Sequence, residues 1–211
     1  MIDKEDYKKG TTTVGIVCKD SIVLAADKRA TLGSLIANKD VDKIFEVTPF
    51  IGMTFAGSAA DGQALAKLMK AEMRLYHLNT GMDPSLTVAA NLTGNVVLER
   101  AKSFIPYYVQ LIVGGKDNGN KFGVFSLDMG GSIIQEKNFT ATGSGSPMAF
   151  GVLEDNWREG MSSEEGIKLA YKAINSAIKR DIFSGEGVNV VVIDKGGYRK
   201  VEPEKVTAKS K

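Results

Sequence analysis

The stretch "YKKGTTTVGIV", residues Tyr7 to Val17, determines how the rest of the chain is interpreted. Three consecutive threonines open an apolar run, and one glycine, Gly10, stands directly before them. Threonine is β-branched and favours strands, so the simplest interpretation of these residues is the start of a β-strand. The Gly10–Thr11 bond also carries a chemical possibility, which depends on what else the chain contains.

The next segments predict hairpins followed by helices. "TTTVGIVC" and "SIVLAAD" are short β-prone runs separated by Lys19-Asp20, and "KIFEVTPFIGMTFAG" turns near Thr48-Pro49. Apolar residues then follow helical spacing over 58–80. Asp83-Pro84 predicts the cap and first residue of a second helix that runs to about residue 103.

Strands and helices return in the same order in the second half. The runs "YYVQLIVGG", "KFGVFSLD", "SIIQE" and "FTATG" predict strands, and helices are expected over 147–158, capped by Ser146, and over 163–182, capped by Ser162 or Ser163. "GVNVVVID" and a short final strand close the chain. Segregated blocks of this kind predict an α+β fold in which two antiparallel sheets pack face to face, each covered by a helix pair.

Composition excludes several classes of function. The 211 residues carry a formal net charge of +2, from 27 basic and 25 acidic residues, which does not indicate nucleic-acid binding. No apolar run approaches the roughly 20 residues that a membrane span needs, and the charged N-terminus is not a secretory signal. The single cysteine, Cys18, excludes an intramolecular disulfide framework, so a cytoplasmic location is the simplest expectation.

The small number of histidines and cysteines also limits the chemistry of any active site. With one histidine, His77, and one cysteine, Cys18, metal clusters built from these ligands are unavailable, and we expect neither a metal nor a cofactor. His77 lies late in a helical pattern and is interpreted as a surface residue, whereas Cys18 is interpreted as a small strand residue. An enzyme with this sequence needs a base other than imidazole.

Thr11 would supply its own base if it became the first residue of the chain. A threonine hydroxyl is a weak nucleophile until a base takes its proton. An α-amino group has a pKa of roughly 7.7–8.0 and is substantially neutral near physiological pH. A neighbouring ammonium would lower that pKa further. Cleavage after Gly10 would release the amine, and the Thr11 hydroxyl itself could attack the Gly10 carbonyl. On these residues alone, a plain strand start remains the simpler alternative.

The order of the motifs resembles a known family. "GTTTVGI", "LAADKRAT", "DKIF", "MTFAGSAADGQ", "TGSGSP", "GVLED" and "KRDIFSGEGVNV" are similar to the proteasome β subunits of archaeal type, from Thr11 to about Asp194. These proteins are N-terminal nucleophile hydrolases with a four-layer αββα sandwich. The resemblance implies a propeptide, residues 1–10, that is removed autocatalytically, and a single catalytic domain over 11–211 that ends in a polar tail at about 203–211.

The resemblance also assigns catalytic roles. Thr11 matches the N-terminal nucleophile, Lys43 the lysine that lowers the pKa of the threonine amine, and Asp27 the acidic residue that holds this lysine. The backbone N–H of Gly57 matches the donor of the oxyanion hole. The residues that match those orienting the amine and relaying protons are Ser144, Asp181 and Ser184.

Substrate and partner expectations follow from the same resemblance. An extended substrate would lie near Thr31, Gly57 and Ala59, and the matched specificity pocket consists of the uncharged residues Ala30, Val41, Phe55 and Ala59. Cleavage after apolar residues of unfolded polypeptides is therefore expected. The implied particle has two seven-membered β rings between two α rings, served by a regulatory ATPase.

Three other classes of protein share parts of this sequence pattern. They are an inactive structural ring subunit, an N-terminal nucleophile amidase acting on a small molecule, and the simpler bacterial two-tier protease. The combination of Gly10-Thr11 with Lys43 and Asp27 favours an active subunit over the first. The "KRDIFSGEG" segment favours the proteasome over the other two.

Overall fold

A computed structural model describes residues 10–202. The expected propeptide therefore lies outside the described residues except for Gly10, and so does the expected polar tail at 203–211. Within 10–202, no helix has both the length and the apolar character needed to cross a membrane.

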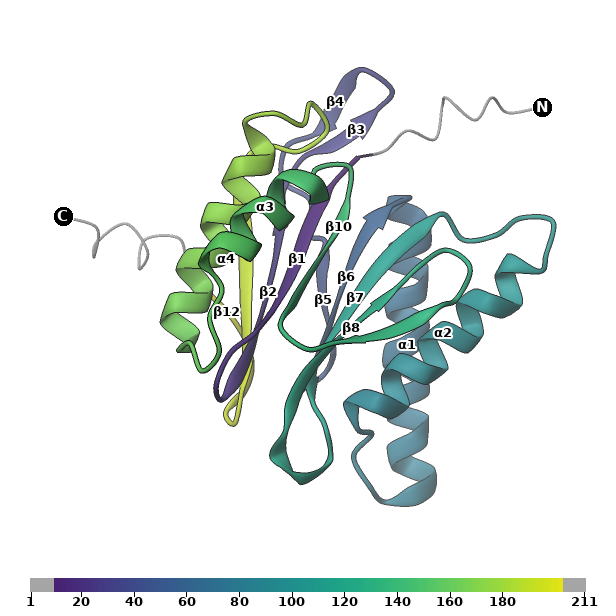
Figure 1. Ribbon diagram of the computed structural model, residues 1–211. Helices are drawn as coiled ribbons and strands as arrows, with labels where there is room; N and C mark the ends of the chain where they lie inside the picture. The colour runs from purple at the N-terminus through teal and green to yellow at the C-terminus, as the bar shows by residue number, and fades with distance from the viewer. Residues whose placement is uncertain (1–9, 203–211) are drawn as a thin grey trace.

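Two five-stranded antiparallel sheets form the centre of the molecule (Figure 1). The strands of the first sheet lie in the order β10 (Phe139–Gly143), β1 (Thr12–Val17), β2 (Ser21–Asp27), β11 (Val188–Asp194) and β12 (Gly197–Lys200). Those of the second lie in the order β5 (Ile44–Thr48), β6 (Ile51–Gly57), β7 (Val109–Lys116), β8 (Phe122–Leu127) and β9 (Ile133–Glu136). A separate hairpin, β3 (Ala30–Leu32) with β4 (Leu35–Asn38), extends beyond the first sheet.

Each sheet is covered on its outer face by two helices, so the predicted α+β fold with four αββα layers is confirmed (Figure 1). Helices α3 (Ser146–Asn156) and α4 (Ser163–Ile178) pack on the first sheet, and α1 (Ala59–Thr80) and α2 (Leu86–Ala101) pack on the second. A short 3-10 turn, Asn118–Asn120, connects β7 to β8.

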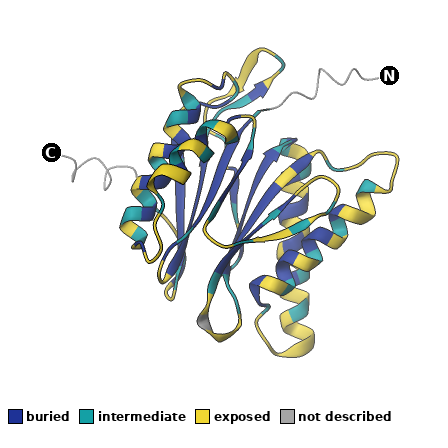
Figure 2. Cartoon of the chain, in the orientation of Figure 1, coloured by how far each residue is buried: buried dark blue, intermediate teal, exposed yellow. Residues whose placement is uncertain are grey.

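Strand β2 shows why this sequence forms a middle layer. All seven of its residues are buried, and alternate side chains point to opposite faces. Ile22 and Leu24 join the apolar cluster between the two sheets, whereas Val23 and Ala25 pack in the cluster beneath α3 and α4. Figure 2 shows that the central strands of the two sheets are buried between the helix layers.

The helix boundaries differ in detail from the sequence prediction. Helix α2 is capped by Ser85, whose Oγ accepts from the Val88 N–H, so the predicted Asp83-Pro84 cap was wrong. Helix α3 begins at Ser146 after Gly145 and lacks a side-chain cap. Helix α4 ends at Ile178 rather than at residue 182. Residues 179–187 form the turn and loop that lead back to the first sheet.

Three threonine hydroxyls join the two sheets near the start of β1. Thr13 Oγ1 lies 2.7 Å from Thr142 Oγ1 of β10 and accepts from Thr54 Oγ1 of β6 at 3.0 Å. Thr13 therefore faces the second sheet. Because alternate residues of a strand share a face, the Thr11 side chain is directed to the same interior side.

Candidate active site

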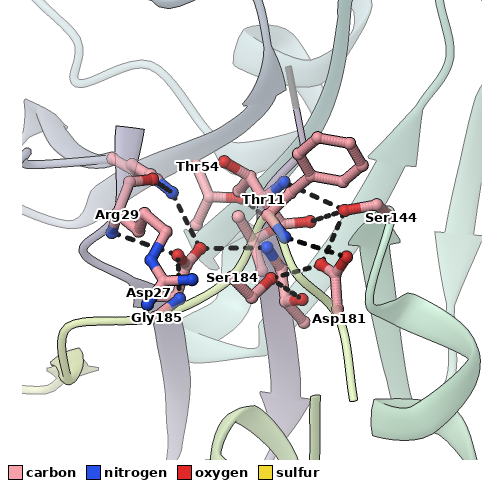
Figure 3. A network of polar contacts seen from close by, with 12 residues as sticks. Thr11, Asp27, Arg29, Thr54, Ser144, Asp181, Ser184 and Gly185 are labelled. Atoms are coloured by element: carbon pink, nitrogen blue, oxygen red, sulfur yellow. Dashed lines mark hydrogen bonds and ion pairs between the residues drawn. The ribbon is translucent and has the colours of Figure 1, made fainter. Parts of the chain in front are cut away.

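Asp27 lies beside Thr11 (Figure 3) and forms a buried ion pair with Lys43. Asp27 ends β2 and is fully buried, and its Oδ1 accepts from Lys43 Nζ at 2.7 Å and from the Thr12 N–H at 3.0 Å. Its Oδ2 accepts from the backbone N–H groups of Arg29 and Gly185, at 3.1 and 2.9 Å. Four donors therefore fix both oxygens of this carboxylate.

Lys43 stands directly before β5 and is only 2% exposed. Its Nζ also donates to the Arg29 carbonyl at 2.6 Å. Burial lowers the pKa of the Lys43 ammonium, and the charge of Asp27 offsets part of that effect. The result is a lysine held in one position by Asp27 and the Arg29 carbonyl, with a proton that is easier to lose than that of a surface lysine.

A second chain of hydrogen bonds reaches the nitrogen of Thr11 (Figure 3). The Thr11 N–H donates to Ser144 Oγ at 3.2 Å, and Ser144 Oγ donates to Asp181 Oδ2 at 2.7 Å. Ser184 Oγ donates to the same oxygen at 2.6 Å and lies 2.7 Å from Thr12 Oγ1. These hydroxyls and the carboxylate form one connected path from Thr11 N into the buried side of the strand.

Glycines allow the backbone to approach closely around Thr11. A Cβ at Gly143, which has φ +91°, would overlap the Thr11 carbonyl, and a Cβ at Gly10 would overlap Phe183 and Ser144 Oγ. Gly57, at the end of β6, has φ +121° and would overlap the Tyr108 carbonyl if it carried a side chain. Each of these positions requires the small size of glycine, and Gly143 and Gly57 also require its freedom in φ.

Two pockets border Gly10, the residue before the Gly10–Thr11 peptide bond. The first, the Lys43 pocket, has a volume of about 230 Å³. Its lining contains all six residues predicted to lie near the substrate, together with others: Gly10, Thr11, Arg29, Ala30, Thr31, Leu32, Ala37, Val41, Lys43, Phe55, Gly57 and Ala59. The second, the Ser144 pocket, has a volume of about 270 Å³ and shares Gly10 and Gly57 with the first.

The predicted catalytic and pocket residues thus lie together, around Thr11, in the structure. Sequence reasoning missed Arg29, Gly185 and Thr12, whose contribution is made largely through backbone groups. Arg29 also donates from its guanidinium to the Ile182 carbonyl at 2.9 Å and pairs with Glu186 at 3.1 Å. The only feature of the sequence that points to Arg29 is its position two residues after Asp27.

The two residues excluded as catalytic lie elsewhere. Cys18 is buried, and burial raises the pKa of its thiol to about 11, which makes it a poor nucleophile. His77 lies in the last turn of α1, half-exposed, and its Nδ1 is 3.0 Å from Asp83 Oδ1.

The αββα layers and a threonine at the start of the first strand, beside a buried lysine and aspartate, define the N-terminal nucleophile hydrolase fold. The sequence pattern of the family described as "Proteasome subunit" matches residues 7–193. The chain belongs to the proteasome subunit family, whose members include peptidases.

Several proteins named proteasome subunit beta are similar to this chain over nearly its full length. The protein named proteasome subunit beta of Methanocaldococcus vulcanius is 46% identical over 202 residues, which cover 96% of this chain and 90% of the relative. Those of Methanosarcina barkeri and Methanosarcina thermophila are each 45% identical, over 97% and 99% of this chain and 96% and 98% of their own lengths. The similarity indicates a β subunit of the 20S proteasome core, which assembles with other subunits.

Proposed function

We propose that this subunit is a threonine-type endopeptidase whose nucleophile is Thr11 and which releases its own active N-terminus by cleavage after Gly10. The observation that carries the proposal is that two polar networks flank the Thr11–Thr12 segment. Asp27, paired with Lys43, accepts from the Thr12 N–H, and Lys43 lines the same pocket as Thr11. Ser144, linked to Asp181 and Ser184, accepts from the Thr11 N–H.

Self-processing needs the Thr11 hydroxyl, the Gly10 carbonyl and one water molecule. Thr11 Oγ1 attacks the Gly10 carbonyl carbon, the C–N bond breaks, and the hydroxyl proton ends on the Thr11 nitrogen. The product is an ester, and water hydrolyses it to a Gly10 carboxylate and a free threonine hydroxyl. Ser144 Oγ, at 3.2 Å from the nitrogen, is placed to exchange a proton with it through Asp181 or water.

The mature reaction is acyl transfer in two steps. The free amine of Thr11 takes the proton of its own hydroxyl as Oγ1 attacks a substrate carbonyl, and then gives that proton to the leaving amine. The ammonium of Lys43 lowers the pKa of the Thr11 amine and so keeps more of it neutral. The N–H of Gly57 stabilises the oxyanion. Water then hydrolyses the acyl-enzyme.

The Lys43 pocket is proposed to hold the residue that precedes the cleaved bond. Phe55 forms part of its lining, packed on Gly62 of α1 and stacked on Phe45 with ring centroids 5.7 Å apart. Val41, Ala30 and Ala59 add apolar surface. Only Lys43 and Arg29 carry charge there, and Asp27 and Glu186 already pair with them, so we expect apolar residues to be preferred.

The proposal extends to the assembly. We expect β rings of seven subunits between α rings, substrates that are unfolded polypeptides, a regulatory ATPase that delivers them, and a cytoplasmic location. The proteasome family supports assembly with other core subunits, and the ring number and the ATPase are inferences from the resemblance.

Intact mass after co-expression with an α subunit tests the proposal. We expect loss of residues 1–10 and hydrolysis of peptides ending in an apolar residue linked to aminomethylcoumarin. Thr11→Ala should abolish both, whereas Thr80→Ala, an exposed threonine at the end of α1, should change neither. An unprocessed chain that is active would refute the mechanism, and a correctly assembled but inactive particle would indicate a structural subunit.

A further inference from the structure

The Ser144 pocket has no role in the mechanism above, although it borders Gly10 and so lies beside the Gly10–Thr11 bond. Its lining contains Ser144, Phe183 and the following residues: Gly10, Ala56, Gly57, Tyr108, Val109, Gln110, Met129 and Gly143. None of these side chains is charged, and most are apolar or aromatic.

The position of this pocket relative to Thr11 determines which part of a substrate can reach it. Thr11 N donates its proton to the leaving amine in the proposed mechanism, so the leaving half must lie beside that nitrogen. Thr11 N contacts Ser144 Oγ, and Ser144 lines this pocket but not the Lys43 pocket. The Lys43 pocket, on the other side of Gly10 and Gly57, holds the acyl half.

We propose that the Ser144 pocket binds the side chain that follows the cleaved bond and selects apolar or aromatic residues there. This inference rests on the proposed function and adds a second specificity site to it. Met129, Tyr108 and Phe183 supply the apolar walls, and Gln110 supplies the one side-chain amide.

The walls of the pocket are held in place by backbone hydrogen bonds. The Tyr108 N–H donates to Asp61 Oδ2 at 3.1 Å, and the Tyr108 carbonyl accepts from the Ser58 N–H at 2.8 Å, so the N-terminus of α1 fixes this residue. The Phe183 N–H donates to Asp181 Oδ1 at 3.2 Å. The backbone at these two walls is therefore held in place before a substrate binds, which lowers the entropic cost of binding.

Gln110 connects the two sheets at this point. It lies on β7 of the second sheet, and its Oε1 accepts from the N–H of Gly143 at the end of β10 in the first sheet, at 3.0 Å. Replacement by glutamate keeps an oxygen acceptor for Gly143 and adds one negative charge to the pocket. Gln110→Glu is therefore a probe of charge that preserves the shape of the pocket.

The experiment uses the assembled core particle and internally quenched peptides that share one apolar residue before the cleaved bond. The residue after that bond is Leu, Phe, Lys or Asp, and mass spectrometry of the products confirms which bond is cut. We expect kcat/KM for Leu and Phe to exceed that for Lys and Asp by about tenfold or more, since an apolar pocket rejects charge. In Gln110→Glu, the ratio of Lys to Asp should rise about tenfold.

The matched control is Gln135→Glu, the same substitution at an exposed position of β9, which should leave all four rates unchanged. Coumarin peptides, which carry no residue after the bond, separate the two proposals. If they are not hydrolysed, the proposed function fails and this inference fails with it. If they are hydrolysed in a Thr11-dependent way but the wild-type rates do not depend on the following residue, only the Ser144 pocket proposal is overturned. If Gln110→Glu does not assemble, the wild-type series alone decides.

Discussion

Asp27→Asn is the substitution that tests the buried centre of the site most directly. The wild-type carboxylate accepts four hydrogen bonds, two on Oδ1 from Lys43 and Thr12 and two on Oδ2 from Arg29 and Gly185. Asparagine offers one oxygen and one NH2 group in the same space. In either orientation the NH2 faces two donors, so two hydrogen bonds are lost and the Lys43 ammonium loses its counter-charge.

The expected loss of stability follows from these contacts. Each buried donor left without an acceptor costs about 1–3 kcal/mol, and removal of one partner of a buried ion pair costs about 3–5 kcal/mol in total. We therefore expect Asp27→Asn to lower the free energy of unfolding by about 4 kcal/mol. For a chain of this length, that corresponds to a decrease in Tm of roughly 8–16 °C.

Thermal unfolding of the chain at one fixed concentration and pH 7 measures this effect. Asp42→Asn is the control, because Asp42 makes an exposed pair with Lys200 at 3.1 Å and should change stability by less than about 1 kcal/mol. Combining Asp27→Asn with Lys43→Met removes the stranded charge and should restore part of the lost Tm. An Asp27→Asn chain that melts within about 2 °C of the wild type, or a double variant that melts lower than Asp27→Asn alone, would refute the reasoning.

Three further outcomes follow from other contacts. Gly10→Ala places a Cβ against Phe183 and should slow self-processing about 100-fold, followed by intact mass over time; an unchanged half-time would contradict the close packing. Burial raises the pKa of the Cys18 thiol to about 11 from an ordinary 9.0, so the folded chain should carry about 100-fold less thiolate. Iodoacetamide at pH 8 should therefore modify Cys18 far more slowly in the folded chain than in urea. Equal rates would show an accessible thiol. Ser162→Ala removes the reciprocal hydrogen bonds with Glu165 that start α4 and should lower Tm by roughly 2–4 °C, and no change in a melting curve would show that the cap contributes nothing.

The layers were predictable because strand and helix periodicities differ. β2 and β11 are apolar on both faces, which only a sheet buried on both sides tolerates, and the helices follow the 3.6-residue spacing. The hairpin of β3 and β4 was missed because β4 has no buried face. Every residue of β4 is exposed, so its sequence carries no alternation to detect.

Within the proposed site, Thr11 is the only residue to which local chemistry points. A threonine preceded by glycine, in a chain with one histidine, raises the hypothesis of a nucleophile that carries its own base, although a plain strand start is the simpler interpretation of these residues alone. The partners of Thr11 come from separate segments, and no spacing rule connects residues 27, 43, 144 and 181. Only the fold brings these residues together. They were named from the sequence because the chain resembles a known family.

Under the proposed mechanism, one peptide bond keeps this site inactive while every other group is already in place. The amide nitrogen of Thr11 donates to Ser144 Oγ but, unlike an amine, has no lone pair available to accept a proton. Gly10 also lines both pockets, so it occupies the point through which a substrate must pass from one to the other. Cleavage after Gly10 therefore creates the base and opens the path in a single step, and neither the Asp27–Lys43 pair nor the Ser144 wall has to move.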